Sequence, residues 1–357
     1  MSVSATGAAA AAKRLWWPVR YARWGRRRPA RPGYTLVIPV PGDLPVFTRL
    51  ALAVCRLQDA ADRVETLVVP DVDSPPVDGI VADAGRDWPD PLRVLRLPPL
   101  ERALLPRLAD PGKNHAAQIV AAVTASRASH ALLHDADLFM LAPDVHDSEY
   151  RYAAAHASAA VGVDGPWDPW FAAHGRQLVA TWEMCADIDW LRASRPSRLF
   201  GHDARLFGEV HTFDTTFWAQ CHTHPSRLTV LPRPGEVVHF NYVISTYRRF
   251  QRSGAATFAD TNLRLLLIRL FIDLFDPDGG GYVVPSRDEL SRGLTDPAAP
   301  VTYAAVDPAV YRDFRGKLDG ILRGDWVAPE RRATAARYLD AFDDHFGRSA
   351  GGDGLDR

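Results

Sequence analysis

The feature that most constrains the fold is a series of short apolar segments that alternate with segments of helical periodicity. Residues 34–40 (YTLVIPV), 65–70 (ETLVVP) and 130–134 (HALLH) are typical of buried strands. Between them, apolar residues recur at helical spacing in 47–57 and 116–123. Strands that alternate with helices favour βαβ units. We therefore expect an α/β fold in which helices flank a mostly parallel, twisted sheet, with ligands at the carboxyl ends of its strands.

The pattern changes along the chain. A short further strand is expected at 92–97, but the sheet signal fades after about residue 165, where aromatic residues and histidines become frequent. Residues 263–275 are nearly all apolar, yet this segment is shorter than the roughly 17–25 residues that span a bilayer, so a buried helix is expected. A last amphipathic helix is expected around 338–346. We expect three parts: a basic leader at 1–33, an α/β domain at 34–250 and a helical section at 251–357.

The net charge of −1 hides an asymmetry. Residues 1–33 hold eight basic side chains and no acidic one, which leaves 34 basic and 43 acidic side chains in the rest of the chain. A body this acidic is a poor binder of nucleic acid, because the phosphate backbone requires clustered positive charge. The leader has two interpretations: a disordered Arg-rich segment, or a peripheral contact with an anionic membrane through arginines and residues such as Trp24.

Composition narrows the setting. With 47% hydrophobic and 24% charged residues, the chain has the balance of a globular protein that buries a core. Its three cysteines are widely spaced and include no CxxC pair, which argues against a disulfide scaffold and favours the cytoplasm. A peripheral position at the inner face of the membrane is the alternative. The abundance of Ala, Arg and Pro is typical of a high-GC genome, so a bacterial source is expected.

The strongest local signal for chemistry is the triplet Asp135-Ala136-Asp137, which directly follows the apolar segment 130–134. Two carboxylates separated by one residue offer the oxygen ligands that a hard divalent cation prefers. The alternative is that both aspartates are solvated or cap the next element. The triplet alone is not specific, so its neighbours decide how it is interpreted.

Four segments, taken in order, resemble the GT-A glycosyltransferases, in particular the family-2-like group, over about residues 34–250. The segments are an opening strand that ends in Ile38-Pro39-Val40, the run 67–73 (LVVPDVD), Gly112-Lys113-Asn114 before an Ala-rich helix, and the DxD about 20 residues later. The resemblance implies a GT-A (Rossmann-like) fold. It also implies an enzyme that transfers a sugar from a nucleotide-diphosphate donor to a carbohydrate or lipid-linked acceptor, in surface-polysaccharide or glycolipid assembly.

The resemblance also implies a cofactor and binding residues. Mn²⁺ or Mg²⁺ would be held by Asp135 and Asp137 and would neutralise the departing diphosphate. His239, in a segment after the acceptor region, is the candidate third metal ligand, although a lone histidine in an apolar stretch is also typical of a core. The candidate donor-binding residues are Pro39, Asp71, Asp73, Lys113, Asn114 and Asp135. For Asp71 the alternative is a turn residue, and for Lys113 a solvated helix start.

An inverting transferase also needs a general base. Family-2-like enzymes usually place it within a Glu-Asp pair after the DxD, and no such pair occurs between residues 138 and 250. Asp203 is the first candidate, because we expect it in a loop that projects into a cleft. Asp214 is the second, and Glu183 a further acid in the region. The departure leaves the stereochemistry open, because a retaining mechanism would not require such a base.

Other interpretations remain. Trp167 and Trp170, in a Pro- and Gly-rich loop, are either acceptor contacts or core residues. A nucleotidyltransferase would use a similar sheet and metal, but its Gly-rich basic phosphate loop is missing after residue 40. A phosphatase of the haloacid dehalogenase type would carry Thr or Val where Phe139 stands. The alternative that is not an enzyme is a catalytically degenerate GT-A-like binding or scaffold protein.

Overall fold

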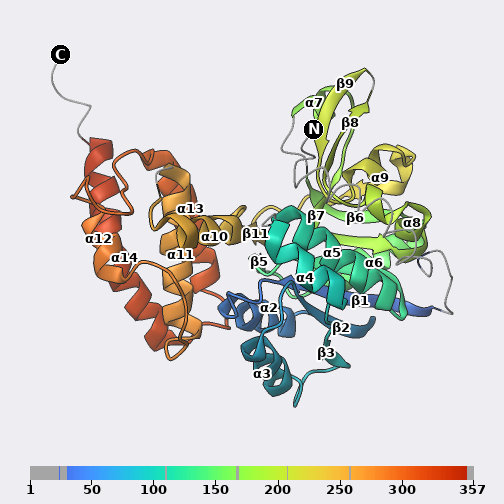
Figure 1. Cartoon of the computed structure of the whole chain (residues 1–357), viewed down its shortest axis with the longest axis horizontal. Helices are drawn as coiled ribbons and strands as arrows, with labels where there is room; N and C mark the ends of the chain where they lie inside the picture. The colour runs from blue at the N-terminus through green and yellow to red at the C-terminus, as the bar shows by residue number, and fades with distance from the viewer. Residues whose placement is uncertain are drawn as a thin grey trace, which may run out of the picture. The chain divides into compact units, whose positions relative to one another are not determined.

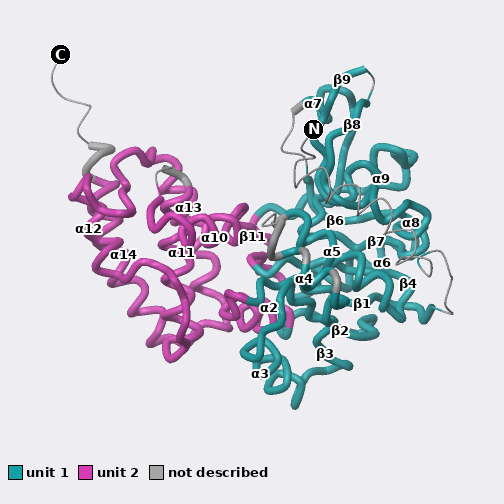
Figure 2. The backbone as a smooth tube through the Cα atoms, viewed as in Figure 1, with its two compact units in different colours: residues 1–42, 56–136, 143–234 teal, residues 43–55, 137–142, 235–357 magenta. Residues whose placement is uncertain are grey.

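The computed structural model describes residue 24 and residues 30–108, 111–165, 169–206, 208–256 and 259–351. The chain divides into two compact units (Figure 2). Unit 1 draws on residues 1–42, 56–136 and 143–234, and unit 2 on residues 43–55, 137–142 and 235–357. The division into a leader, a catalytic domain and a C-terminal section stays a prediction.

Unit 1 is built around a seven-stranded sheet with the order β10-β6-β7-β4-β1-β2-β3 (Figure 1). Its strands are β1 (Arg31–Val40), β2 (Arg63–Pro70), β3 (Leu92–Val94), β4 (Ala128–His134), β6 (Ala160–Asp164), β7 (Val179–Asp187) and β10 (Leu228–Val230). All neighbouring strands pair in parallel except β7, which is antiparallel to both β4 and β6. The expected mostly parallel α/β sheet is confirmed.

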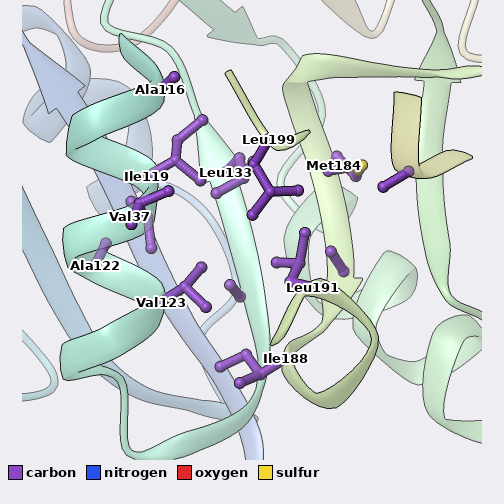
Figure 3. Close-up of a cluster of buried hydrophobic side chains, with 14 of the residues drawn as sticks. Val37, Ala116, Ile119, Ala122, Val123, Leu133, Met184, Ile188, Leu191 and Leu199 are labelled. Atoms are coloured by element: carbon purple, nitrogen blue, oxygen red, sulfur yellow. The ribbon is translucent and has the colours of Figure 1, made fainter. Parts of the chain in front are cut away.

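Helices flank this sheet, as the periodicity predicts. The helices of unit 1 are α3 (Pro75–Ala84), α4 (Pro99–Leu108), α5 (Pro111–Ala125), α6 (Val145–His156), α7 (Pro169–Ala173), α8 (Ile188–Ala193) and α9 (Phe217–Cys221). The predicted apolar face of α5 is buried: Ile119 and Val123 lie in one core cluster with Val37 of β1, Leu133 of β4 and Leu191 of α8 (Figure 3). Burial of this face fixes α5 against the strands whose ends carry the candidate site.

A two-stranded hairpin, β8 (His202–Leu206) with β9 (Glu209–Phe213), also belongs to unit 1. Its inner side packs into a small aromatic cluster with α7 and α9, in which Phe171 contacts Phe213 and Phe217 at ring-centroid distances of 5.9 and 6.3 Å. Part of the histidine- and tryptophan-rich region is therefore the core of a separate lobe.

Unit 2 is mainly helical. It contains most of α2 (Val46–Arg56), a short ladder of β5 (Leu138–Met140) with β11 (Val237–His239), and the helices α10 (Val243–Ser253), α11 (Ala259–Phe275), α12 (Arg287–Arg292), α13 (Pro308–Leu322) and α14 (Pro329–Gly351). Phe271 of the apolar helix α11 packs against Phe47 and Phe139 at centroid distances of 5.9 and 5.5 Å. The predicted buried helix is confirmed, and no helix among the described residues has the length and apolarity to span a membrane.

Two expectations about strands were wrong. The sheet does not end near residue 165, because β7 lies inside it and β10 forms one edge. The sequence of β7 (VATWEMCAD) lacks a continuous apolar run, because it includes Thr181 and Glu183. Both are buried in the strand and are hydrogen-bonded inside the protein. The strand expected at 92–97 is also shorter, ending at Val94.

Trp24, in the predicted leader, is the first residue of the chain that the structure describes. Its side chain is only 4% exposed, and it belongs to the same core cluster as α5. Its indole N–H donates to the backbone carbonyl of Ser194 at 2.8 Å. Trp24 is thus a core residue, and the other tryptophans of the leader, such as Trp16, lie outside the described residues.

Candidate functional site

The carboxyl ends of three parallel strands form one edge of the sheet in unit 1. β1 ends at Val40, β2 is followed by Asp71, and β4 is followed by Asp135. Pro39 is tolerated in this central strand because β1 pairs with β4 only up to Val37, so the missing N–H of Pro39 removes no bond of that ladder. This edge is where ligands bind in open α/β sheets.

The first turns of α5 connect this edge. The Asn114 side-chain amide donates to Asp71 Oδ2 at 2.8 Å, and His115 Nε2 lies 2.7 Å from Asp135 Oδ1. One turn later, the Gln118 amide donates to backbone carbonyls near the ends of β1, at 2.9 Å, and of β2. Polar residues of one helix are therefore bonded at the ends of three strands, which fixes the N-terminal part of α5 at the candidate site.

The two aspartates after β2 differ in environment. Asp71 is 2% exposed, and its Oδ1 accepts the backbone N–H of Gly42 at 3.0 Å, so its carboxylate connects the β1 loop with α5. Asp73 is exposed and pairs with Arg96 at 2.9 Å and with Arg102. Slight desolvation raises the pKa of Asp73, but hydrogen bonds from the two guanidinium groups outweigh it and hold this pKa below its usual value. Of the two, Asp71 lies at the strand edge.

Asp214 lies close enough to His115 and Asp135 for both to influence its charge. Desolvation raises the pKa of Asp214, the carboxylate of Asp135 raises it further, and His115 lowers it. The turn after Asp214 contains Thr216, whose φ of +68° is a left-handed conformation that is costly for a β-branched residue. Thr216 is held there by its hydroxyl, which lies 3.0 Å from that of Thr181 and accepts from the Gln220 amide at 3.1 Å.

Asp203 does not lie in a loop, as the sequence suggested. It is on β8, exposed, and its Oδ1 accepts from the hydroxyl of Thr212 on β9 at 2.8 Å. The hairpin was missed because Gly201 and the short polar strand resemble loop sequence. Glu183 is fully buried in β7, where its Oε2 accepts the backbone N–H of Val163 at 3.0 Å. A catalytic role for Asp203 stays a prediction.

In unit 2, the β5–β11 ladder brings Asp137 and His239 together. His239 is paired with Leu138, the residue after Asp137, and its Nε2 lies 3.3 Å from Asp137 Oδ1. Asp137 is 6% exposed. Asp135 precedes Asp137 by two residues, so the chain keeps the two Cα atoms within about 7 Å of each other. The carboxylate of Asp137 and the imidazole of His239 are donors that suit Mn²⁺, and a carboxylate also suits Mg²⁺.

His115 is a functional candidate that the sequence analysis did not select. Its one visible signal was its place beside Asn114 at the start of a helix, and its contact with Asp135 needs the tertiary fold. Trp167 lies outside the described residues. Trp170 is on α7 rather than in a loop, and its ring packs against the rings of His174 and His211, each at a centroid distance of 4.0 Å.

No family model matches the sequence, and no curated protein matches it. Among solved structures, the chain is similar to the mannosyltransferase PcManGT from Pyrobaculum calidifontis in complex with GDP-Man and Mn²⁺, at 15% identity and a TM-score of 0.41, over 98% of this chain and 97% of that one. It is also similar to S. aureus TarS 1–349, at 13% identity and a TM-score of 0.35, over 88% and 89%. A third match is the Mycobacterium tuberculosis glucosyl-3-phosphoglycerate synthase in complex with Mn²⁺ and UDP-glucose, at 12% identity and a TM-score of 0.34, over 64% and 81%.

The first and third of these structures were each solved with Mn²⁺ and a nucleotide sugar.

Proposed function

We propose that this protein is a metal-dependent glycosyltransferase that moves a sugar from a nucleotide-diphosphate donor to an acceptor. The observation that carries the proposal is the contact of Asp137, the second aspartate of the DxD, with His239 at 3.3 Å. A backbone ladder, rather than chance surface proximity, sets this pairing. Asp135, Asp137 and His239 are the proposed metal ligands, and Mn²⁺ or Mg²⁺ is the proposed cofactor.

The bound cation would neutralise the charge that develops on the departing nucleoside diphosphate. The N-terminus of α5, with Lys113, supplies further positive potential for the phosphates, because the free N–H groups of a helix start favour anions. Asp71 and Asn114 lie beside it and would bind the nucleoside, and Pro39 lines the same edge. Asp73 is a more exposed candidate for the nucleoside, and binding through it would compete with its arginine partners.

Asp214 is the proposed general base, ahead of Asp203. Burial raises its pKa and the carboxylate of Asp135 adds to this, and a raised pKa suits a group that takes a proton from an acceptor hydroxyl. Asp203 is instead exposed on a hairpin strand and bonded to Thr212. With Asp214 as base, the transfer proceeds with inversion.

The acceptor is proposed to be a carbohydrate or a lipid-linked glycan, in a bacterial cytoplasm. Peripheral membrane contact through residues 1–33 remains part of the proposal. Because Trp24 is buried, that contact would have to involve other residues of the leader.

Titration calorimetry with UDP, GDP and dTDP, with and without Mn²⁺, tests the proposal. We expect one nucleotide to bind only with the metal, and Asp135→Ala/Asp137→Ala to abolish binding. Asp83→Ala/Asp87→Ala, which removes two exposed carboxylates of unit 1, is the matched control. Failure of all three nucleotides to bind to folded protein would refute the transferase. Metal-dependent binding without turnover of any nucleotide sugar would favour the degenerate binding protein.

A further inference from the structure

We propose that His115 is a positioning residue of the metal site, which holds the carboxylate of Asp135 in the orientation that binds the cation. This inference rests on the proposed function, since it gives Asp135 the role of a metal ligand. His115 itself is assigned no contact with metal or substrate.

The contact between the two side chains is short and partly shielded. His115 Nε2 lies 2.7 Å from Asp135 Oδ1, and the two side chains are 20% and 22% exposed. A carboxylate has no donor of its own, so a favourable contact at this distance requires a proton on Nε2. The protonated imidazole forms a close ion pair with Oδ1, which leaves Oδ2 available for a cation.

Both partners are themselves held in place. The backbone N–H of Asp135 donates to the carbonyl of Trp182 on β7 at 3.0 Å, which continues the β4–β7 ladder into the DxD. His115 lies on α5, which is anchored on each side of it by Asn114 and Gln118. A rigid donor on a rigid helix thus meets an acceptor on a rigid strand end, so the orientation of the carboxylate is set before any ligand arrives.

The negative charge of Asp214 disfavours the position of the Asp135 carboxylate, and the imidazole of His115 offsets this repulsion. Asp214 interacts electrostatically with both His115 and Asp135. Without the imidazole, the carboxylates of Asp135 and Asp214 would repel each other, and Asp135 would be free to rotate. Hydrogen bonds to ligating carboxylates typically change metal affinity by about 10–100-fold when they are removed.

Three substitutions separate positioning from general packing. His115→Ala removes the donor. His115→Gln keeps an N–H near the place of Nε2, whereas the shorter His115→Asn places its amide nearer to Nδ1. His222→Ala is the control, because this exposed histidine bonds the carbonyl of Trp218 on the short helix α9.

The measurement is Mn²⁺ affinity without nucleotide, from the electron paramagnetic resonance signal of free Mn²⁺, together with the thermal unfolding midpoint of each variant. We expect His115→Ala to weaken Mn²⁺ binding about 10–100-fold, His115→Gln to restore most of the affinity, and His115→Asn not to restore it. The control should bind like the wild type, and the affinities should not follow the unfolding midpoints.

Wild-type Mn²⁺ affinity in folded His115→Ala would overturn the inference and leave the proposed function intact. Affinities that simply follow the unfolding midpoints would also overturn it, because His115 would then only stabilise the fold. If the wild type bound Mn²⁺ no better than Asp135→Ala/Asp137→Ala, the proposed metal site would fail, and the inference would fail with it.

Discussion

Two residues have the same unfavourable backbone conformation in opposite surroundings. Thr216 and Tyr242 both precede a short or medium helix and have φ values of +68° and +67°. Thr216 is buried and hydrogen-bonded, whereas Tyr242 is 65% exposed and makes no side-chain capping bond. The guanidinium of Arg264 lies 5.5 Å from the Tyr242 ring centroid. A left-handed conformation costs an L-residue roughly 1–2 kcal/mol, and only at Thr216 do buried hydrogen bonds offset that cost.

We therefore expect Tyr242→Gly to raise the free energy of unfolding by about 1 kcal/mol, because glycine adopts this φ without strain. Thr216→Gly should lower it, since the same relief comes with the loss of the hydroxyl contacts to Thr181 and Gln220. Differential scanning calorimetry of the two variants measures both changes. Shifts of the same sign would show that backbone conformation alone governs these positions.

The assignment of the general base is also decided at single residues. Asp214→Asn should lower kcat about 10²–10⁴-fold with little change in nucleotide affinity, because the amide keeps the shape but takes up no proton. Asp203→Asn is the matched control, since Asp203 is an exposed acid bonded only locally on its hairpin. Steady-state rates with the donor identified by calorimetry provide the comparison. A larger loss of kcat in Asp203→Asn would reverse the assignment.

At the scale of elements, the packing of α6 on β7 buries two acids, one from each element. Glu149 of α6 and Glu183 of β7 are both fully buried, and Arg233 Nε donates to Glu149 Oε1 at 3.2 Å. Desolvation raises the pKa of each carboxyl, and for Glu149 the nearby charge of Glu183 raises it further. The two acids are hydrogen-bonded to each other, so one of them retains its proton. A neutral acid beside a carboxylate is the stable arrangement in this interior.

This pair makes stability depend on pH. Because the pKa of Glu149 is higher in the folded than in the unfolded state, the folded state binds more protons above pH 4.5, and stability falls as the pH rises toward the folded-state pKa. Glu149→Gln imitates the neutral acid at every pH. We expect the unfolding midpoint of Glu149→Gln to exceed that of the wild type by a larger margin at pH 8 than at pH 5. Each kcal/mol of difference in the free energy of unfolding corresponds to about 2–4 °C.

Thermal unfolding across that pH range measures the effect, with Glu209→Gln, an exposed acid of β9, as the control. A constant difference between Glu149→Gln and the wild type at every pH would mean that Glu149 is ionised throughout.

The same elements show what the sequence could predict. β1, β2, β4 and α5 are marked by apolar runs and helical periodicity, because their buried faces need little beyond hydrophobic burial. β7 was not predicted, because Thr181 and Glu183 are satisfied by partners distant in the sequence. The DxD was visible as a local pattern. The contact of His115 with Asp135 and the closeness of Asp214 depend on tertiary packing, which no local pattern encodes.

At the scale of the whole molecule, Trp24 is the described residue of the N-terminal region at which sequence and structure differ. The basic charge of residues 1–33 and their tryptophans suggested a segment that is either disordered or in contact with a membrane. Trp24, however, lies in the core of unit 1 with Trp190 and Ile188, and its indole is bonded to Ser194. A large aromatic side chain buried this completely stabilises the unit that holds Asp135 and Asp214.

Trp24→Ala should therefore lower the free energy of unfolding by about 3–5 kcal/mol, because it removes a buried ring and leaves the Ser194 carbonyl without its donor. Trp24→Phe should cost less, since it keeps most of the apolar area. Urea unfolding measures both changes, and sedimentation with anionic phosphatidylglycerol vesicles, on folded protein, measures membrane contact. If Trp24 is a core residue, vesicle binding stays unchanged while stability falls. A loss of vesicle binding at unchanged stability would instead place Trp24 at the membrane surface and contradict its burial.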